Sequence, residues 1–247
     1  MTLIDQLERE GNWLFRWRSY LPVIFIPFIA IALVNQTRWP LGSEAMQSAW
    51  QVICLSVSVL GLAIRVIAVG HAPANTSGRN TESQLADQIN TTGIYATVRH
   101  PLYLGNYLIA LGVVMSPSVI WLPVVYSLSF WIYYERIMMA EEGFLRSKFG
   151  RQFTDWAEKT PPFIPRLSQW TKPAESFSLR SVLRREYTGL ALMILMHCSV
   201  VEMQYVFAER RFLVAPFWTS LLAFGSISYL LLRQLKVHTK VLDVPGR

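Results

Sequence analysis

Arg99, His100 and Pro101 form the tripeptide whose residue types and order best suit chemistry in this sequence. The residue before a proline favours an extended backbone, and proline suits the first position of a helix, where its missing N–H needs no partner. The free N–H groups at such a helix start, beside an arginine and a histidine, predict a binding site for an anion. The same cations also suit a plain basic flank at a membrane surface, so both interpretations stay open here.

Tyr95, Tyr103 and Gly105 surround that tripeptide and extend what it can bind. Aromatic ring faces attract cations, and a glycine one turn into a helix allows close approach of another backbone. An anion site beside an aromatic wall suits an amino-acid-like cofactor that carries a sulfonium. The alternative is a belt of tyrosines at a membrane interface, which needs no ligand.

Glu141 and Glu142 are the second group of candidate residues, within the segment ERIMMAEEGFLRSKFG that begins at Glu135. Neighbouring positions on a helix point about 100° apart, so one carboxylate can face a pocket while the other faces solvent or a cation. Leu145 and Phe149 continue the face of Glu142 at helical spacing. Such a carboxylate can hold the amino group of a cofactor, and a solvated helix with charge pairs four residues apart is the structural alternative.

The elements that must position these residues are indicated by the distribution of charge. Five long segments contain no Asp, Glu, Lys or Arg: residues 19–37, 45–64, 100–134, 187–201 and 212–232. A hydrocarbon core about 30 Å thick needs roughly 20 apolar residues of helix. The third segment is too long for one span, and Ser116, Pro117 and Ser118 near its middle predict a hairpin of two short helices.

The predicted fold class is therefore all-α, a polytopic integral membrane protein of about six helices with a cytoplasmic cofactor site. The helices are expected near residues 20–36, 46–69, 101–115, 118–135, 187–207 and 212–232. Spanning segments must be helical here because lipid offers backbone groups no hydrogen-bond partners. Ahead of the first span, residues 2–18 suit either an amphipathic helix at the membrane interface or a frayed polar tail.

The basic residues indicate how such a bundle is oriented. If six helices alternate, 19 of the 23 Lys and Arg residues lie on one side and three on the other, with Arg65 inside a span. The positive-inside rule then places both termini and both long polar loops in the cytoplasm. The excess of basic residues on the cytoplasmic side accounts for the net charge of +7, so no nucleic-acid partner is expected. A bacterial inner membrane is expected rather than the endoplasmic reticulum.

The cytoplasmic segments after the fourth span are predicted from their prolines and their charge. Residues 137–158 should continue the fourth span as a helix. Pro161, Pro162 and Pro165 should end that helix and force an extended stretch. Residues 167–186 are expected to form a basic connector along the inner membrane surface, where anionic lipid attracts it.

Three stretches taken together resemble a known family. They are Gly-x-Tyr-x-x-x-Arg-His-Pro-x-Tyr-x-Gly from Gly93, Glu-Glu-x-x-Leu-x-x-x-Phe-Gly from Glu141, and Pro-x-Phe-Ile-Pro from Pro161. In this order they are similar to the isoprenylcysteine carboxyl methyltransferase and phospholipid methyltransferase superfamily, over roughly residues 60–166. We therefore expect a methyltransferase core at 1–166, and a second part at 167–247 with the connector and two additional helices.

The resemblance implies a site for S-adenosylmethionine, which leaves as S-adenosylhomocysteine, at the cytoplasmic ends of membrane helices. It assigns the cofactor pocket to the motif residues Tyr95, Arg99, His100, Pro101, Tyr103, Gly105, Glu141 and Glu142. The predicted catalytic residues are Arg99 and Glu142, and Arg99 is expected to orient an anionic nucleophile or the cofactor carboxylate. Phe153 departs from the family pattern, in which tyrosine is frequent, so that a ring remains without its hydroxyl.

The methyl acceptor is expected to be a membrane lipid or a lipidated substrate. A prenylated cysteine carboxylate, a phospholipid amine, a lipid phosphate and a small thiol all remain open. For contacts to its head group we predict His71, Asn75 and Arg79, with a polar connector as the alternative for their loop. Arg65 is a further candidate, either for an anionic substrate or for an ion pair with Glu202.

Two other functions remain open from the sequence. A membrane reductase of the sterol type carries a related Arg-His-Pro stretch and uses NADPH, but residues 71–92 offer only Arg79 for its additional phosphate. A non-enzymatic scaffold or small transporter is the second. Cys54 and Cys198 lie in predicted spans without metal-binding spacing, so no metal site is expected. The sequence gives no indication of oligomeric state.

Overall fold

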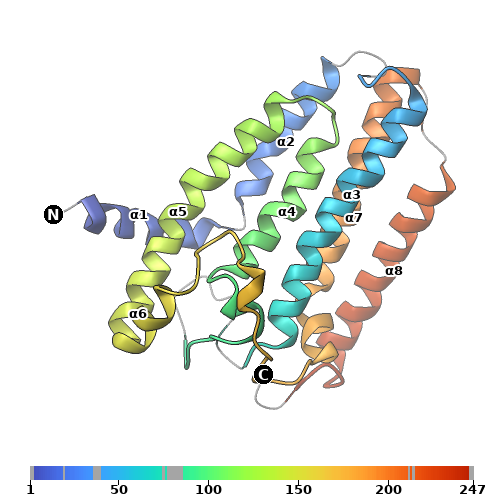
Figure 1. Cartoon of the computed structure of the whole chain (residues 1–247). Coiled ribbons are helices and arrows are strands. Elements are labelled where there is room, and N and C mark those ends of the chain that lie inside the picture. The colour runs from blue at the N-terminus through green and yellow to red at the C-terminus, as the bar shows by residue number, and fades with distance from the viewer. Residues whose placement is uncertain are drawn as a thin grey trace.

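The computed structural model describes residues 3–18, 20–35, 40–73, 76, 86–210, 212 and 215–244, and within them the protein is all-α without a strand. The chain folds as a bundle of long helices with its long polar connections, which carry η1 and η2, at one end (Figure 1). The helices are α1 (Leu3–Trp17), α2 (Leu21–Val34), α3 (Glu44–Gly70), η1 (Gly93–Ala96), α4 (Pro101–Met115), α5 (Trp121–Phe149), α6 (Arg151–Ala157), η2 (Leu167–Gln169), α7 (Leu179–Glu209) and α8 (Pro216–His238).

Each of the six predicted spans corresponds to one helix of the bundle, namely α2, α3, α4, α5, α7 and α8. By length and composition, α3 and α7 are the two helices in the described part that can cross a membrane. Shorter apolar helices lie at Val23–Val34 in α2 and along α4. The turn between α4 and α5 confirms the predicted hairpin, with Ser118 at a φ of 62°.

Small residues let α3 and α4 pack closely along their length. A Cβ on Gly61 would lie 2.6 Å from the carbonyl oxygen of Gly105, and one on Gly105 would lie 2.8 Å from that of Gly61. Deeper in the bundle, Ser58 donates a hydrogen bond to the Ile109 carbonyl at 2.7 Å and lies 2.8 Å from His197 Nε2 on α7. Such small-residue seams and interhelical hydrogen bonds are the contacts that hold helices together in lipid.

A buried polar cluster ties α3, the α4–α5 turn and α7 together at the end of the bundle opposite the polar connections. The Gln51 amide donates to the Ser116 carbonyl at 2.9 Å and also bonds Gln204 and the Ser116 hydroxyl. Gln47 donates to Ser118 Oγ at 3.0 Å. Because buried amides need partners, this cluster fixes the height at which the hairpin turns.

Several helix boundaries differ from those predicted, among them the start of α5 at Trp121 and the end of α8 at His238, and two of the differences have clear local causes. The helix expected over 137–158 breaks at Gly150, whose φ of 54° favours glycine, so that α5 ends at Phe149 and α6 starts in a new direction. The connector predicted at 167–186 becomes helical at Leu179, because Ser178 caps α7 by accepting the Ser181 N–H at 3.3 Å.

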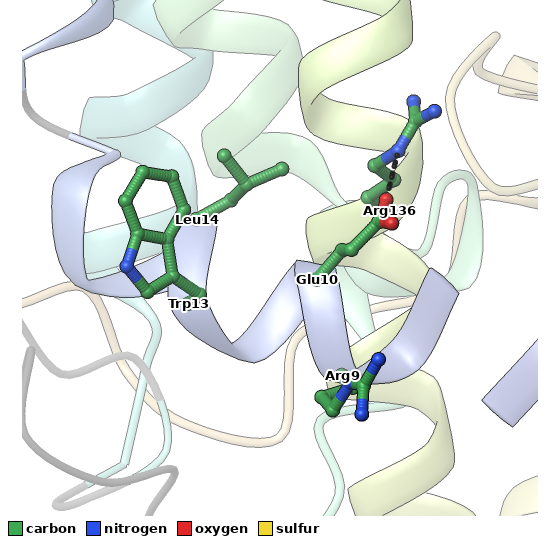
Figure 2. A pocket seen from close by; sticks show the side chains of 5 residues that line it. All are labelled: Arg9, Glu10, Trp13, Leu14 and Arg136. Carbon is green, nitrogen blue, oxygen red and sulfur yellow. Dashed lines mark hydrogen bonds and ion pairs between the residues drawn. The ribbon is translucent and has the colours of Figure 1, made fainter. Parts of the chain in front are cut away.

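The N-terminal segment forms helix α1, which crosses the second half of α5 (Figure 1). Arg136 Nε lies 3.1 Å from Glu10 Oε2, and this ion pair borders a surface hollow of about 370 Å³ between the two helices. Figure 2 shows Glu10 of α1 reaching Arg136 of α5, and along α1 the side chain of Leu14 packs against the hydrophobic core whereas that of Arg9 is exposed. The segment is therefore an ordered amphipathic helix and not a frayed tail.

Candidate functional site

A cavity of about 830 Å³ lies among α2, α3, α4, α5 and α7 and holds most of the predicted site residues. At one end it is lined by charged and aromatic side chains from η1, the start of α4, and the second half of α5. Further along, the lining becomes apolar, with Ile29 of α2, Val113 of α4, Phe130 of α5 and Met196 of α7. One space therefore joins a polar chamber to an apolar channel.

His100, Arg99 and Glu142 form the centre of the polar chamber. His100 Nε2 lies 2.9 Å from Glu142 Oε1, and Arg99 Nη1 donates to Glu142 Oε2 at 3.1 Å. One carboxylate thus binds both members of the motif pair, although α5 brings it from 42 and 43 positions away in sequence. The predicted association of the two motif stretches is present in the structure.

The proline-rich stretch after α6 fixes the backbone of that motif pair. The N–H of Arg99 donates to the Pro161 carbonyl at 2.9 Å, and that of His100 donates to the Pro162 carbonyl at 3.2 Å. Proline leaves its carbonyl free to accept while it holds the chain extended. This pairing explains why His100 keeps an extended φ of −118° before helix α4 starts at Pro101.

Glu141 lies on the other side of the His100 ring, with its Oε2 at 3.5 Å from Nδ1. Burial alone would lower the pKa of His100, but the hydrogen bonds and charges of Glu141 and Glu142 outweigh it and raise that pKa above its ordinary value. Burial alone would raise the pKa of Glu141, and the contact with His100 instead lowers it. The chamber therefore favours a histidinium held between two carboxylates.

Two buried polar atoms in the chamber have no hydrogen-bond partner. They are the donor Arg99 Nε and the acceptor Glu141 Oε2. Buried polar groups are nearly always paired in folded proteins, and Glu141 Oε2 has only the 3.5 Å ion-pair contact with His100. A donor and an acceptor without hydrogen bonds, both on residues that line one cavity, favour a ligand that carries both complementary groups. A zwitterionic amino acid moiety does so, because its carboxylate accepts from a guanidinium while its ammonium donates to a carboxylate.

Aromatic rings line the chamber next to these atoms. The Tyr103 ring stacks on His100 with centroids 5.5 Å apart and an angle of 18° between the planes. Trp156 donates from its indole N–H to the Tyr95 carbonyl at 3.2 Å and packs edge-on against the buried ring of Phe153. Burial raises the pKa of Tyr95, so this phenol stays neutral. The chamber thus offers ring faces to a cation or a flat base.

Gly105 is buried at the α3–α4 crossing and is not among the described residues that line the cavity. A Cβ there would lie 2.5 Å from Cγ of Arg65. The backbone that approaches Gly105 closely, as the sequence predicted, is therefore that of helix α3. The missing side chain of Gly105 leaves room for the Arg65 side chain. Pro101 does line the cavity, as the first residue of α4.

Arg65 enters the cavity wall as part of a buried ion pair. Its Nε and Nη2 donate to the two carboxylate oxygens of Glu186 at 2.7 Å each, and its Nη1 donates to Asn106 Oδ1 at 2.6 Å. The predicted pairing with Glu202 is wrong, because Glu186 lies near the same end of the bundle as Arg65 whereas Glu202 lies near the far end of α7. Glu186 was not recognised as the partner because α7 begins at Leu179, within the stretch that was predicted to be a basic connector.

The three loop residues predicted to contact an acceptor head group are only partly described. His71 caps the end of α3, with Nδ1 at 2.8 Å from the Glu175 carbonyl and its ring against Phe177, away from the cavity lining. Asn75 and Arg79 lie outside the described residues. Within the part of the chain that the structure describes, no group of His, Cys, Asp and Glu is arranged to hold a metal ion.

Comparison with known proteins supports the motif resemblance. Residues 51–152 match the phospholipid methyltransferase family. A protein-S-isoprenylcysteine O-methyltransferase of Schizosaccharomyces pombe is 32% identical over 119 residues, which are 48% of this chain and 50% of that relative. Both matches support the resemblance to the isoprenylcysteine carboxyl methyltransferase and phospholipid methyltransferase superfamily over this part of the chain.

Two further relatives are named as metal-resistance proteins. A cobalt-zinc-cadmium resistance protein of Cupriavidus metallidurans is 27% identical over 191 residues, 74% of this chain and 82% of the relative. A nickel-cobalt-cadmium resistance protein of Alcaligenes xylosoxydans xylosoxydans is 28% identical over 158 residues, 64% of this chain and 68% of the relative. No solved structure matches the chain.

The segment matched to the methyltransferase family covers most of α3, all of α4 and all of α5, but it ends before α7. Asn106, Trp156 and Glu186 are lining residues that sequence reasoning did not select. Asn106 directly follows a motif glycine, and this position was the available signal for it. Trp156 and Glu186 lie in segments whose path depends on tertiary contacts, so no spacing rule pointed to them.

Proposed function

We propose that the protein transfers a methyl group from S-adenosylmethionine to a membrane-embedded acceptor at the cytoplasmic face. The observation that carries this proposal is the single cavity that joins the orphan pair of Arg99 Nε and Glu141 Oε2 to an apolar channel. A methyltransferase for lipids or lipidated substrates needs both parts: a polar place for the methyl donor, and apolar space for the acceptor's hydrocarbon.

The chamber residues fit the cofactor on chemical grounds. Arg99 would hold its carboxylate and Glu141 its ammonium group, and these are the two partners that the orphan atoms lack. Tyr95, Tyr103 and Trp156 supply ring faces for the sulfonium and the adenine. When bound, the cofactor supplies a methyl group on a positively charged sulfur.

The residues of the chain contribute positioning and exclusion of water more than proton transfer. Methyl transfer needs an acceptor atom held in line with the reacting carbon in a dry site. Glu142 keeps Arg99 and His100 in place by binding both, and Tyr103 covers the histidine ring. An acceptor that is already anionic, such as a carboxylate or phosphate, needs no general base.

The outer surface of the bundle supports the membrane placement. Large apolar side chains are exposed along α2, α3, α5, α7 and α8, for example Ile24, Leu60, Leu128, Leu195 and Phe224. Exposed apolar surface of this extent indicates contact with lipid. The polar chamber lies at the end that carries most of the Lys and Arg residues, so we place this end and both termini in the cytoplasm, with six membrane crossings.

Cofactor binding is the direct test of this proposal. Detergent-solubilised wild-type protein should bind S-adenosylhomocysteine saturably in calorimetry, and Glu141→Gln should weaken that binding at least tenfold. Glu158→Gln, at the exposed end of α6, is the matched control and should bind as wild type. Binding of NADPH without S-adenosylhomocysteine would place the chain with reductases, and binding of neither would end the enzymatic proposal.

A further inference from the structure

Helix α7 forms one wall of the cavity although it lies outside the segment that matches the methyltransferase family. Glu186, Gly189, Met193 and Met196 line the cavity at intervals of three or four residues, so they share one face of the helix. That face passes from a carboxylate to flexible thioether side chains along the axis. This wall of the cavity therefore comes from a part of the chain that lies outside the family motifs.

The ion pair between Arg65 and Glu186 lies at the junction between the polar chamber and the apolar channel. Along α4, the cavity-lining residues run from Tyr103 through Asn106 to Ala110 and Val113. The polar lining thus ends at Asn106, which is hydrogen-bonded to Arg65. From Asn106 to Val113 the helix rises about 10 Å, enough for roughly eight methylene groups of an extended chain.

Arg65 retains hydrogen-bonding capacity at this junction. A guanidinium has five N–H groups, and the contacts with Glu186 and Asn106 use three of them. The two carboxylate oxygens hold the guanidinium plane in one orientation, and only 15% of the Arg65 side chain and 5% of the Glu186 side chain are exposed. The remaining N–H groups suit an oxygen acceptor brought to the junction.

We propose that Glu186 is a positioning residue that holds Arg65 against the head group of the methyl acceptor, and that α7 supplies the wall for its hydrocarbon chain. The acceptor class is then an amphiphile with an oxygen-bearing head group, such as a carboxylate or a phosphate, on a chain that lies along Met193 and Met196. This inference rests on the proposed methyl transfer and specifies where the acceptor is held.

The ion pair allows α3 and α7 each to carry one buried charged side chain, Arg65 and Glu186. A guanidinium without a partner would snorkel to water, because an unpaired charge in an apolar helix is costly. Gln in place of Glu186 keeps the shape of the side chain but loses the second strong oxygen contact and the charge. The guanidinium then loses its fixed orientation, and acceptor binding weakens while the cofactor chamber, one helix away, keeps its contacts.

The test measures the two ends of the cavity separately. Calorimetry with S-adenosylhomocysteine reports on the polar chamber. Transfer of tritiated methyl groups to S-farnesylcysteine, and to vesicles of a total bacterial lipid extract, reports on the acceptor. For the methylated probe, Glu186→Gln should raise the acceptor KM about tenfold and change S-adenosylhomocysteine affinity less than twofold. Asp243→Asn, which weakens the exposed ion pair between Arg184 of α7 and Asp243 after α8, is the control and should change neither.

A double variant separates the positioning role from a purely structural one. Arg65→Met with Glu186→Met removes both charges and keeps the volume, which often preserves the stability of a buried pair. It should unfold near the wild-type temperature and still show the raised acceptor KM. Wild-type KM in the double variant would overturn the inference, as would methylation of neither probe by a wild type that binds S-adenosylhomocysteine. Failure of the wild type to bind S-adenosylhomocysteine would instead overturn the proposed function.

Discussion

His100 and Glu142 meet at 2.9 Å across the start of α4 and the second half of α5, and Glu142 also binds Arg99. The contact turns two motif stretches into one site, because a single carboxylate fixes both a histidine ring and a guanidinium. The ring in turn lies between Glu142 and Glu141, and only Glu141 has a buried oxygen without a hydrogen bond, its Oε2, which makes an ion-pair contact with His100 at 3.5 Å. We therefore propose different tasks for the two adjacent carboxylates: Glu142 organises the chamber and Glu141 binds a ligand.

Glu142→Gln should weaken S-adenosylhomocysteine binding by about tenfold, because charge-assisted hydrogen bonds to Arg99 and His100 become weaker neutral ones. Calorimetry in detergent measures the change. Glu135→Gln, two turns earlier on the same helix and exposed, is the matched control and should bind as wild type. Equal affinity in Glu142→Gln and wild type would show that the chamber does not depend on this carboxylate.

The thermal stability should depend on pH through His100. Its pKa is raised above the usual value near 6.5, so its protonated form stabilises the fold fully below that pH and the contribution is lost as pH rises through the raised pKa. Glu141 acts in the opposite sense, since its pKa is lowered and its contribution is lost only as pH falls below about 4.5. Melting curves between pH 6 and 9 should decline for wild type, and the decline should be smaller for His100→Gln.

Gly105→Ala should destabilise the bundle, because the new methyl group would lie 2.5 Å from Arg65 Cγ and 2.8 Å from the Gly61 carbonyl oxygen. Overpacking of this kind typically costs about 1–3 kcal/mol. Gly225→Ala is a milder comparison, since its methyl group would meet only the side chain of Ile194, at 3.1 Å. Thermal unfolding in one detergent ranks the two variants, and a lower melting temperature for Gly225→Ala would contradict the expected order.

Gln51→Leu should lower stability without changing cofactor affinity. The substitution removes the acceptor of the Ser116 hydroxyl and the donor to Gln204 Oε1 in a buried cluster, at a cost of roughly 1–3 kcal/mol. The cluster lies at the far end of α3 from the chamber, so S-adenosylhomocysteine should bind the variant as it binds wild type. A large loss of affinity would show that the two ends of the bundle are coupled.

The proposed topology predicts which added cysteines are reachable from outside an intact bacterial cell. Ala45→Cys, exposed at the start of α3, should react with a membrane-impermeant maleimide, whereas Lys159→Cys, exposed beyond α6, should react only after permeabilisation. The native thiols of Cys54 and Cys198 are buried and provide a low background. The reverse labelling pattern would invert the orientation and with it the cytoplasmic placement of the chamber.

Much of the architecture could be predicted because membrane helices leave a simple signal, the absence of charge over about 20 residues. That signal located all six long helices and the hairpin at Ser116–Ser118. The same signal did not locate the helix boundaries that lie in charged stretches. Leu179 begins α7 within a basic stretch, and Gly150 interrupts α5 within a segment of good helix formers, because capping and backbone conformation decide these positions.

The candidate residues could be predicted where they form short runs in the sequence, as Arg99 with His100 and Glu141 with Glu142 do, although α5 brings the second run from 42 positions away. The site was not predictable where partners come from distant helices. Arg65 was recognised as needing a partner, yet Glu202 and Glu186 are both acidic residues of the same helix, and only the depth at which α7 packs against α3 selects between them. Likewise, the close approach at Gly105 was foreseen while the group that makes it was not.

The separation of Arg65 and Glu186 by 121 residues has a consequence for biogenesis. A ribosome adds about 5–20 residues per second, so the guanidinium of α3 would wait roughly 6–24 s before its carboxylate partner is synthesised. Asn106, 41 residues after Arg65, is available earlier and can hold the cation near the membrane edge in the meantime. In the proposed topology, neutralisation of this charge therefore coincides with insertion of α7, and a chain truncated before that helix would keep a cation without a carboxylate partner within the bilayer.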